Sequence, residues 1–175
     1  MLEIPSTWTA WVRTCVVTLG LVGWGCATTR FEGGRFDDGR LAFRVGPLPG
    51  SFERLSERGA LLAFRDAATG DVVLVNGRCD RDGDDVPLEA LRAHLLLTFT
   101  ERVVVSESRR MIDGREALYT RLAAKLDGVE RRFHALVLKK DACVFDFVSF
   151  SARGLDESAP AFERLVEGFH LERRP

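Results

Sequence analysis

The sequence predicts an α+β fold in which an antiparallel sheet of about six strands is covered by helices on both faces. Three stretches lead to this prediction: a strand meander in residues 115–152 and two amphipathic helices, one in residues 87–99 and one near the C-terminus. In the meander, Asp127-Gly128 stands between two apolar runs. This is typical of a two-residue hairpin turn, because both turn positions need positive φ. The expected meander strands are 116–126, 129–139 and 143–152.

The turn at Asp127-Gly128 also predicts how the first two of these strands pair. A shift by one residue would move every apolar side chain to the opposite face, so one register is strongly specified. The expected pairs are Leu126–Val129, Leu122–Phe133, Thr120–Ala135 and Leu118–Val137 on one face, and Lys125–Glu130 and Tyr119–Leu136 on the other.

Both helices carry apolar residues at helical spacing, which predicts that each packs one side against the sheet. In the first helix, Leu96 and Leu97 widen the apolar arc, so deep burial is expected. The second helix should have Ser158 as its N-cap and Pro160 in its first turn. The last meander strand is apolar on both faces, so the sheet needs a cover on each side. The apolar residues at helical spacing are Leu88, Leu91, Leu95 and Phe99 in the first helix, and Phe162, Leu165, Val166 and Phe169 in the second.

Further strands are expected at residues 41–45, 60–66, 71–76 and 102–112. Gly46-Pro-Leu-Pro-Gly50 ends the first of them, because proline cannot donate a backbone hydrogen bond to a sheet. Ala67-Ala-Thr-Gly70 should join the next two as a hairpin, and Asp113-Gly114 should join the last one to the meander.

Residues 1–25 are predicted to be a signal peptide. Arg13 precedes a twelve-residue apolar run, 14–25, which is too short to cross about 30 Å of hydrocarbon as a helix. Its length is that of the apolar region of a secretory signal. The alternative is a buried core helix, which the glycines at the end of the run disfavour.

The run ends at Gly25-Cys26, which resembles the lipobox of bacterial lipoproteins, where a small residue precedes the cysteine that receives the lipid. Gly23 and Trp24 depart from that pattern, which usually has Leu three residues before the cysteine and a small residue two before. Cleavage near Ala27, with release of a soluble protein, is therefore the alternative. We expect lipid attachment at Cys26, a flexible tether over residues 26–40 and a single domain over 41–175.

The cysteines are consistent with export. Of the four, cleavage removes Cys15 and lipidation uses Cys26. Cys79 and Cys143 remain, and in an oxidising compartment we expect them to form a disulfide. The alternative is two free buried cysteines that act as small apolar side chains.

Several classes of function are disfavoured. A net charge of −1, with scattered basic residues, offers no surface for nucleic acid. No Cys-x-x-Cys pair is present, so no metal is expected. The acidic stretch 79–85 lacks the glycine and glutamate of a calcium loop, which leaves an irregular cation site as a minor alternative. Motifs of hydrolases, metalloproteases, phosphate loops and dinucleotide binding are also missing from the sequence.

The histidines and Asp146 were considered as catalytic candidates. His94, His134 and His170 fall on three different predicted elements. In the predicted register His134 lies opposite Arg121, which suggests a neutral surface residue. Asp146, between two phenylalanines, is expected to be partly exposed and paired with an arginine, although a shifted carboxylate there could be functional. We therefore expect no catalytic residues and no cofactor.

The order of elements resembles that of the Mog1/PsbP-like superfamily over residues 41–171. The similarity is carried by Phe43-Arg-Val-Gly-Pro-Leu-Pro-Gly-Ser-Phe52, by Ile112-Asp-Gly-Arg-Glu-Ala117 and by the strand at 144–150 before a phenylalanine-rich final helix. Members of that superfamily place an antiparallel sheet between helices. They include a photosystem extrinsic subunit, a small-GTPase-binding protein and bacterial lipoproteins. The resemblance implies partner binding and offers no catalytic residues to carry over.

The function we expect is that of a periplasmic lipoprotein, anchored to a membrane that we take to be the outer membrane. It would act as a non-catalytic binding or assembly module for an envelope protein partner. The alternative is a carrier or sensor of a small apolar ligand held between a helix and the sheet.

Overall fold

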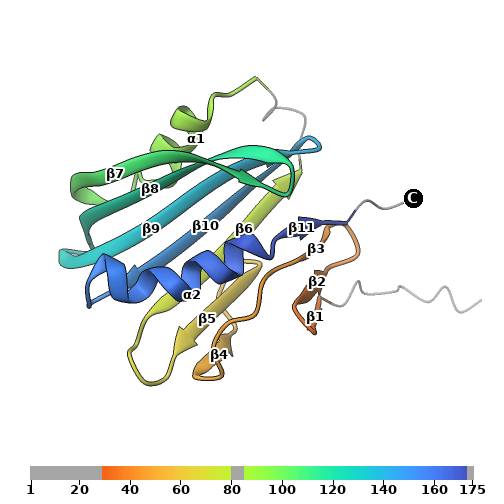
Figure 1. The fold of residues 1–175 in the computed structure, drawn as a ribbon, viewed down its shortest axis with the longest axis horizontal. Coiled ribbons are helices and arrows are strands. Elements are labelled where there is room, and N and C mark those ends of the chain that lie inside the picture. The colour runs from red at the N-terminus through yellow and green to blue at the C-terminus, as the bar shows by residue number, and fades with distance from the viewer. Residues whose placement is uncertain (1–28, 80–84, 173–175) are drawn as a thin grey trace, which may run out of the picture.

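Residues 29–79 and 85–172 are described by the computed structural model, and within them the chain forms eleven strands and two helices (Figure 1). The strands are β1 (Arg30–Glu32), β2 (Arg35–Asp37), β3 (Ala42–Arg44), β4 (Phe52–Leu55), β5 (Leu62–Asp66), β6 (Val72–Cys79), β7 (Thr100–Ile112), β8 (Arg115–Leu126), β9 (Val129–Lys140), β10 (Cys143–Ser151) and β11 (His170–Leu171). The helices are α1 (Leu88–Leu95) and α2 (Leu155–Glu167).

The main sheet has seven antiparallel strands in the order β4-β5-β6-β10-β9-β8-β7. The meander and the hairpin between β5 and β6 are as predicted. The sheet has one strand more than the expected six, because β4 adds an edge that has no alternating pattern in the sequence. Every predicted pair of the β8–β9 register is present, from Leu126 opposite Val129 to Leu118 opposite Val137.

The two helices cover opposite faces of this sheet, as predicted, with α2 in front and α1 behind in Figure 1. Phe162 of α2 belongs to the same buried cluster as Tyr119, whereas Leu91 of α1 clusters with Leu118. Adjacent residues of a strand point to opposite faces, so Leu118 and Tyr119 identify the two sides. We call them the α1 side and the α2 side.

Both helices differ from the predicted ones at their ends. The first is shorter than expected: it ends at Leu95, and Leu97 is 66% exposed, so the prediction of its deep burial was wrong. The second begins one turn earlier, with Gly154 at the N-cap. Ser158 therefore lies inside the helix, where its hydroxyl bonds the carbonyl oxygen of Gly154 instead of capping a free N–H group.

The structure has a small second sheet with the strand order β1-β2-β3-β11. The prediction of a flexible tether over residues 26–40 was therefore wrong for residues 30–37, which form β1 and β2. Residues 30–37 form a hairpin whose turn uses Gly33 and Gly34 at φ of 55° and 77°. Phe36 is fully buried and stacks on Phe43, with ring centroids 4.9 Å apart. The folded domain therefore includes residues before 41, because the Phe36 side chain supplies part of the core.

A close backbone contact fixes the C-terminal end of α2. The N–H group of Gly46 donates to the carbonyl oxygen of Leu165 at 2.9 Å, and the Cα atom of Gly46 packs against Gly168. A Cβ atom on Gly46 would overlap the carbonyl oxygen of Arg164. The Gly-Pro-Leu-Pro-Gly segment, predicted only as a strand break, therefore also holds α2 in place.

Candidate functional site

The most exposed apolar surface of the molecule lies on the edge strand β7. In the part of the chain that the structure describes, β8 is the only neighbouring strand of β7. Six large apolar side chains are exposed in that part, and four belong to β7: Val103 (62%), Val104 (47%), Val105 (56%) and Met111 (69%). Exposed apolar groups gathered on one element mark an interaction site more often than scattered ones do.

The backbone of β7 has an irregular half and a regular half. Two register shifts against β8 lie between Thr100 and Val103 and between Val104 and Ser106, whereas Ser106–Ile112 pairs with β8 without interruption. Bulges and charges are the usual means by which proteins protect a sheet edge from unwanted pairing. The regular half lacks a bulge and is protected by charged side chains alone, so its outer edge admits a strand of complementary charge.

Charged side chains follow the regular half on the α1 side of the sheet. Glu107 lies 3.4 Å from Arg92 of α1. Arg109 forms ion pairs with Glu89 of α1 and with Glu116 of β8. The Arg109 side chain is half exposed and the Glu107 side chain one third exposed, so both are accessible to a partner that approaches the edge of the sheet.

A buried polar network lies on the α2 side, on strands β8 and β9. His134 is fully buried, with Nδ1 2.6 Å from the Tyr119 hydroxyl and Nε2 3.0 Å from Oγ of Ser158. The predicted pairing of His134 with Arg121 is present, but the predicted surface position was wrong, because α2 covers this part of β9.

Burial determines the protonation states in this network. It lowers the pKa of His134 to about 4 and raises the pKa of Tyr119 to about 12. The neutral imidazole then accepts a hydrogen bond from Tyr119 at Nδ1 and donates one from Nε2 to Ser158, which in turn donates to the carbonyl oxygen of Gly154. Every member has a partner, so the network links β8, β9 and α2 as a structural unit.

The other catalytic candidates do not join His134. Asp146 lies on the α1 side, opposite Val137, and pairs with Arg78 at 3.3 Å, as predicted for a partly exposed carboxylate. Burial raises the pKa of Asp146, and the Arg78 guanidinium opposes this shift. His94 is exposed on α1, and His170 bonds Asp113 at 2.8 Å. His94 is close enough to Asp146 to oppose the rise in its carboxyl pKa as well, but the four groups do not come together in one site.

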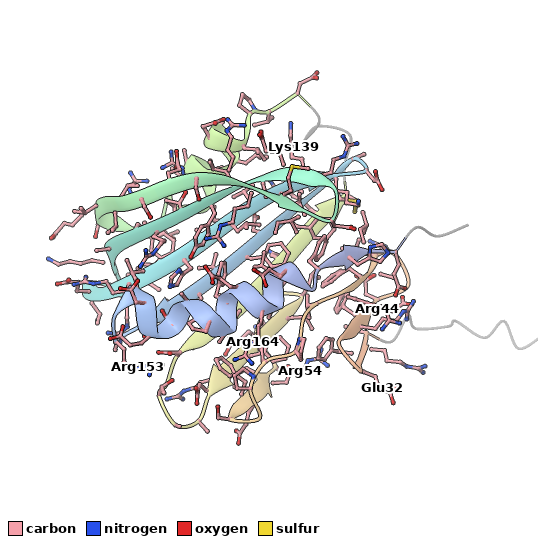
Figure 2. All side chains as sticks on the ribbon, viewed as in Figure 1. Glu32, Arg44, Arg54, Lys139, Arg153 and Arg164 are labelled. Carbon is pink, nitrogen blue, oxygen red and sulfur yellow. A yellow bond between two sulfur atoms is a disulfide. The ribbon has the colours of Figure 1, made fainter. Side chains whose placement is uncertain are left out.

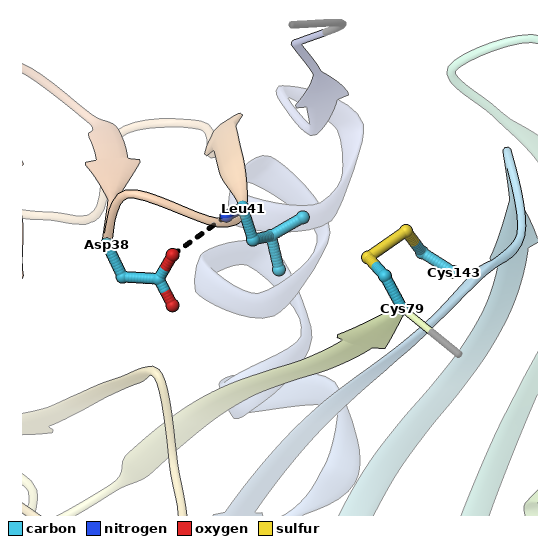
Figure 3. The surroundings of a disulfide bond; sticks show 4 residues. All are labelled: Asp38, Leu41, Cys79 and Cys143. Atoms are coloured by element: carbon cyan, nitrogen blue, oxygen red, sulfur yellow. Dashed lines mark hydrogen bonds between the residues drawn. A yellow bond between two sulfur atoms is a disulfide. The ribbon is translucent and has the colours of Figure 1, made fainter.

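The predicted disulfide is present between Cys79 and Cys143 (Figure 3). The two residues face each other at the end of β6 and the start of β10, with Cα atoms 4.0 Å apart. The bond links two residues that are 64 positions apart in the sequence. A structural disulfide favours an oxidising compartment outside the cytoplasm.

An apolar groove of about 270 Å³ lies between the small sheet, the main sheet and α2. Its side chains include Phe31, Leu48, Phe52 and Phe64. The guanidinium of Arg54 lies 5.2 Å from the centroid of the Phe31 ring, at the side of the small sheet (Figure 2). A larger cleft of about 630 Å³ at the start of α1 is lined mostly by charged side chains, among them Arg109 with its two glutamate partners.

Three sequence predictions fall outside the described residues: the signal peptide over residues 1–25, lipid attachment at Cys26, and the part of the acidic stretch from Asp80 to Asp84. Within residues 29–79 and 85–172, no three His, Cys, Asp or Glu side chains gather in a way that could hold a metal ion. Neither α1 nor α2 has the length and apolar character of a membrane-crossing helix.

Comparison with known proteins finds no matching family model and no matching curated protein. Solved structures do match. The solution structure of cyanobacterial PsbP (CyanoP) from Synechocystis sp. PCC 6803 has a TM-score of 0.54 at 14% identity, over 90% of this chain and 99% of that one. LpqN of Mycobacterium tuberculosis, described as involved in cell envelope biogenesis, has a TM-score of 0.51 at 13% identity, over 83% and 90%.

A third structure comes from Bacteroides thetaiotaomicron VPI-5482, with a TM-score of 0.55 at 12% identity. The match covers 77% of this chain but 46% of that one, so this chain spans less than half of its length. Identities this low establish the fold alone. The chain has the Mog1/PsbP-like fold, as the order of its elements predicted.

Proposed function

We propose that this chain is a periplasmic lipoprotein, attached at Cys26 to the outer membrane, that acts as a non-catalytic binding or assembly module of the cell envelope. The disulfide between Cys79 and Cys143 supports a location outside the cytoplasm. The fold shared with LpqN supports a role in the envelope, although it does not identify a partner.

The exposed edge of β7 is the observation that carries the proposal. Polar side chains are expected on an exposed edge strand. On β7, however, four large apolar side chains are exposed to solvent. An extended segment can add to such an edge through backbone hydrogen bonds, with side-chain contacts that select the partner. We therefore assign β7 as the docking surface.

The proposed anchor would keep the domain close to the membrane. Only residues 27–29 separate Cys26 from the first strand residue, Arg30. Even a fully extended segment of this length reaches at most about 14 Å. The domain would then meet its partner near the membrane surface and not at the end of a long linker.

Fractionation of cells that express the wild type or Cys26→Ser tests the anchor. We expect the wild type in the membrane fraction and the variant in the soluble periplasmic fraction, because stable anchoring needs the acyl chains. Equal recovery of both proteins in the soluble fraction would contradict the anchor.

Site-specific photo-crosslinking in cells tests the docking surface. A photoreactive residue in place of Val104 on β7 should give discrete protein adducts. The same residue in place of Arg65 on β5 is the control, since Arg65 is also exposed but lies at the far end of the sheet. Adducts at neither position, or the same adducts at both, would contradict β7 as the docking surface.

The apolar groove supports a second candidate function, that of a carrier or sensor of a small apolar ligand. Phe31, Leu48 and Phe52 are partly exposed there, although a volume of about 270 Å³ is small for a carrier. A fatty acid binding assay tests this function. Leu48→Asp should abolish binding, and Val104→Lys should leave it unchanged. No binding by the wild type would exclude this candidate.

A further inference from the structure

We propose that the partner of β7 is a second copy of this chain, and that the two β7 strands pair antiparallel about a two-fold axis at Ser108. This inference rests on the proposed function, because it names the partner of the same docking surface. It is argued from the pairing geometry and the charge pattern of the regular half, Ser106–Ile112.

The geometry first restricts the possible registers. In a regular strand, every second residue directs its backbone N–H and C=O groups to the outer edge. A symmetric antiparallel ladder joins outward residues of one copy to outward residues of the other. The two-fold axis must then pass through a residue that faces its own equivalent, and registers centred between two residues are excluded.

Charge then selects among the remaining centres. A centre at Glu107 would place two carboxylates opposite each other, and a centre at Arg109 or Arg110 would do the same with two guanidinium groups. Such like-charge pairs destabilise a sheet. A centre at Ser106 would put the bulge beside the axis, and centres at Met111 or Ile112 would leave most of β7 unpaired.

A centre at Ser108 is the one that matches opposite charges. Glu107 then faces Arg109 of the second copy, and symmetry repeats this pair on the other side of the axis. Both residues lie on the α1 side, because Glu107 is opposite Thr120 and Arg109 is opposite Leu118 in β8. Each new pair would continue an existing row of alternating charge, since Arg109 already binds Glu116 and Glu107 already lies near Arg92.

The same register accounts for two of the four exposed apolar side chains of β7. Val105, at the bulge next to the regular half, would approach Met111 of the second copy at each end of the paired segment, and these residues are 56% and 69% exposed in the single chain. Both helices pack mainly on β8, β9 and β10. Their contacts with β7 include ion pairs of Glu89 and Arg92 of α1 and of Glu163 of α2, and Ser106–Arg109 remains exposed. The surface is therefore both accessible and complementary to itself.

The expected dimer is weak in solution. A single strand pair of this length buries less than the roughly 800 Å² per partner of a standard stable interface. We expect a dissociation constant on the order of micromolar. Attachment of both copies to one membrane would raise their effective concentration, so dimers would form there first.

Cysteine crosslinking tests the register. The full chain carrying Cys15→Ser and Cys26→Ser is the background, and Ser108→Cys or Ser106→Cys is added. Both serines are exposed and lie on the α2 side. At the proposed axis, the two residues at position 108 would have Cα atoms about 5 Å apart, within reach of a disulfide. Those at position 106 would be about 14 Å apart.

Under mild oxidation, we expect at least a tenfold higher yield of covalent dimer from Ser108→Cys than from Ser106→Cys, measured on a non-reducing gel. The Ser106→Cys variant controls for random collision, because it has the same chemistry, side of the sheet and strand. Equal yields from both variants, or no dimer from Ser108→Cys, would overturn the proposed register.

A mixing experiment tests the charge pairing independently of stability. Glu107→Arg and Arg109→Glu should each weaken self-association at least tenfold, because each homodimer would contain two like-charge pairs. A mixture of the two variants restores both opposite-charge pairs, so it should form a heterodimer with the wild-type affinity. Native mass spectrometry distinguishes the three species. A mixture that stays monomeric would contradict the pairing, even if each variant alone were less stable.

Photo-crosslinking at Val104 separates failure of this inference from failure of the proposed function. An adduct of twice the chain mass supports self-pairing. An adduct with a different protein, together with a monomer in solution, would overturn self-pairing and leave β7 as a docking surface. The absence of both adducts and dimer would overturn both proposals.

Discussion

The α2 side of the sheet and the β7 edge are built differently, although both include residues of the same meander. On the α2 side, Phe162 and Leu165 are essentially inaccessible to solvent and a complete polar network lies beneath the helix. On β7, two strands away from His134, Val103 and Met111 are more than 60% exposed. The difference indicates that the α2 side stabilises the fold, whereas the exposed apolar side chains of β7 contribute little to stability and are available for binding.

The largest effect is expected from Phe162→Ala. The Phe162 ring is 1% exposed and stacks on His134 and Tyr119, so its removal leaves a cavity in the core. We expect a loss of about 4 kcal/mol in the free energy of unfolding, measured by urea denaturation. Leu97→Ala is the exposed control and should change stability by less than about 0.5 kcal/mol. Similar losses in both variants would contradict the burial of α2.

Gly46→Ala should have the next largest effect. The added Cβ atom would overlap the carbonyl oxygen of Arg164, so α2 must shift away from the sheet. A loss of about 3 kcal/mol is expected from such overpacking. Gly50→Ala is the matched control in the same segment, because nothing lies within 4 Å of a Cβ atom there. Equal melting temperatures of the two variants would contradict the backbone contact.

The buried network predicts a pH dependence of intermediate size. Burial lowers the pKa of His134 from 6.5 to about 4 in the folded chain. Below pH 6.5 the unfolded chain therefore binds a proton that the folded chain excludes, and stability falls as the pH falls towards 4. The expected loss from pH 8 to pH 5 is about 2 kcal/mol. His134→Gln should lack this part of the pH dependence; an identical pH profile would argue against a neutral buried imidazole.

The smallest effect on stability is expected on β7. Val104→Lys replaces a side chain that is already 47% exposed, so the free energy of unfolding should change by less than about 0.5 kcal/mol. Self-association through β7 should nevertheless weaken, because the lysine charge would lie next to the end of the paired segment. A large loss of stability would mean that β7 is part of the core, and the contrast with the α2 side would no longer hold.

Much of the fold could be predicted because its signals are local. Asp127-Gly128 sets the register of β8 and β9 through the φ angles of two consecutive residues, and both have positive φ in the structure. The pairing of Cys79 with Cys143 followed from counting the cysteines that remain after export. The hairpin of β1 and β2 had a comparable signal, Gly33-Gly34 between Phe31 and Phe36, but the Thr, Gly and Asp content of residues 27–40 predicted a flexible tether instead.

The candidate site could be predicted only in part. The strand that became β7 was expected, but its exposure was not, because a run such as Val103–Val105 has the composition of a buried strand. Its place at the edge depends on the order of all seven strands, which no local pattern encodes. The charges of Glu107 and Arg109 indicate a possible pairing partner only when the strand is known to lie at an exposed edge of the sheet.

The sequence alone therefore determined the α+β class, the register of the meander and the disulfide, because periodicity, turn chemistry and cysteine number are properties of nearby residues or simple counts. Tertiary structure decided the burial of His134, the internal position of Ser158 and the exposure of β7. Each of these depends on which distant element lies across the side chain: α2 covers His134, whereas in the described structure nothing covers β7. Coverage of this kind is a property of the assembled layers and not of the local sequence.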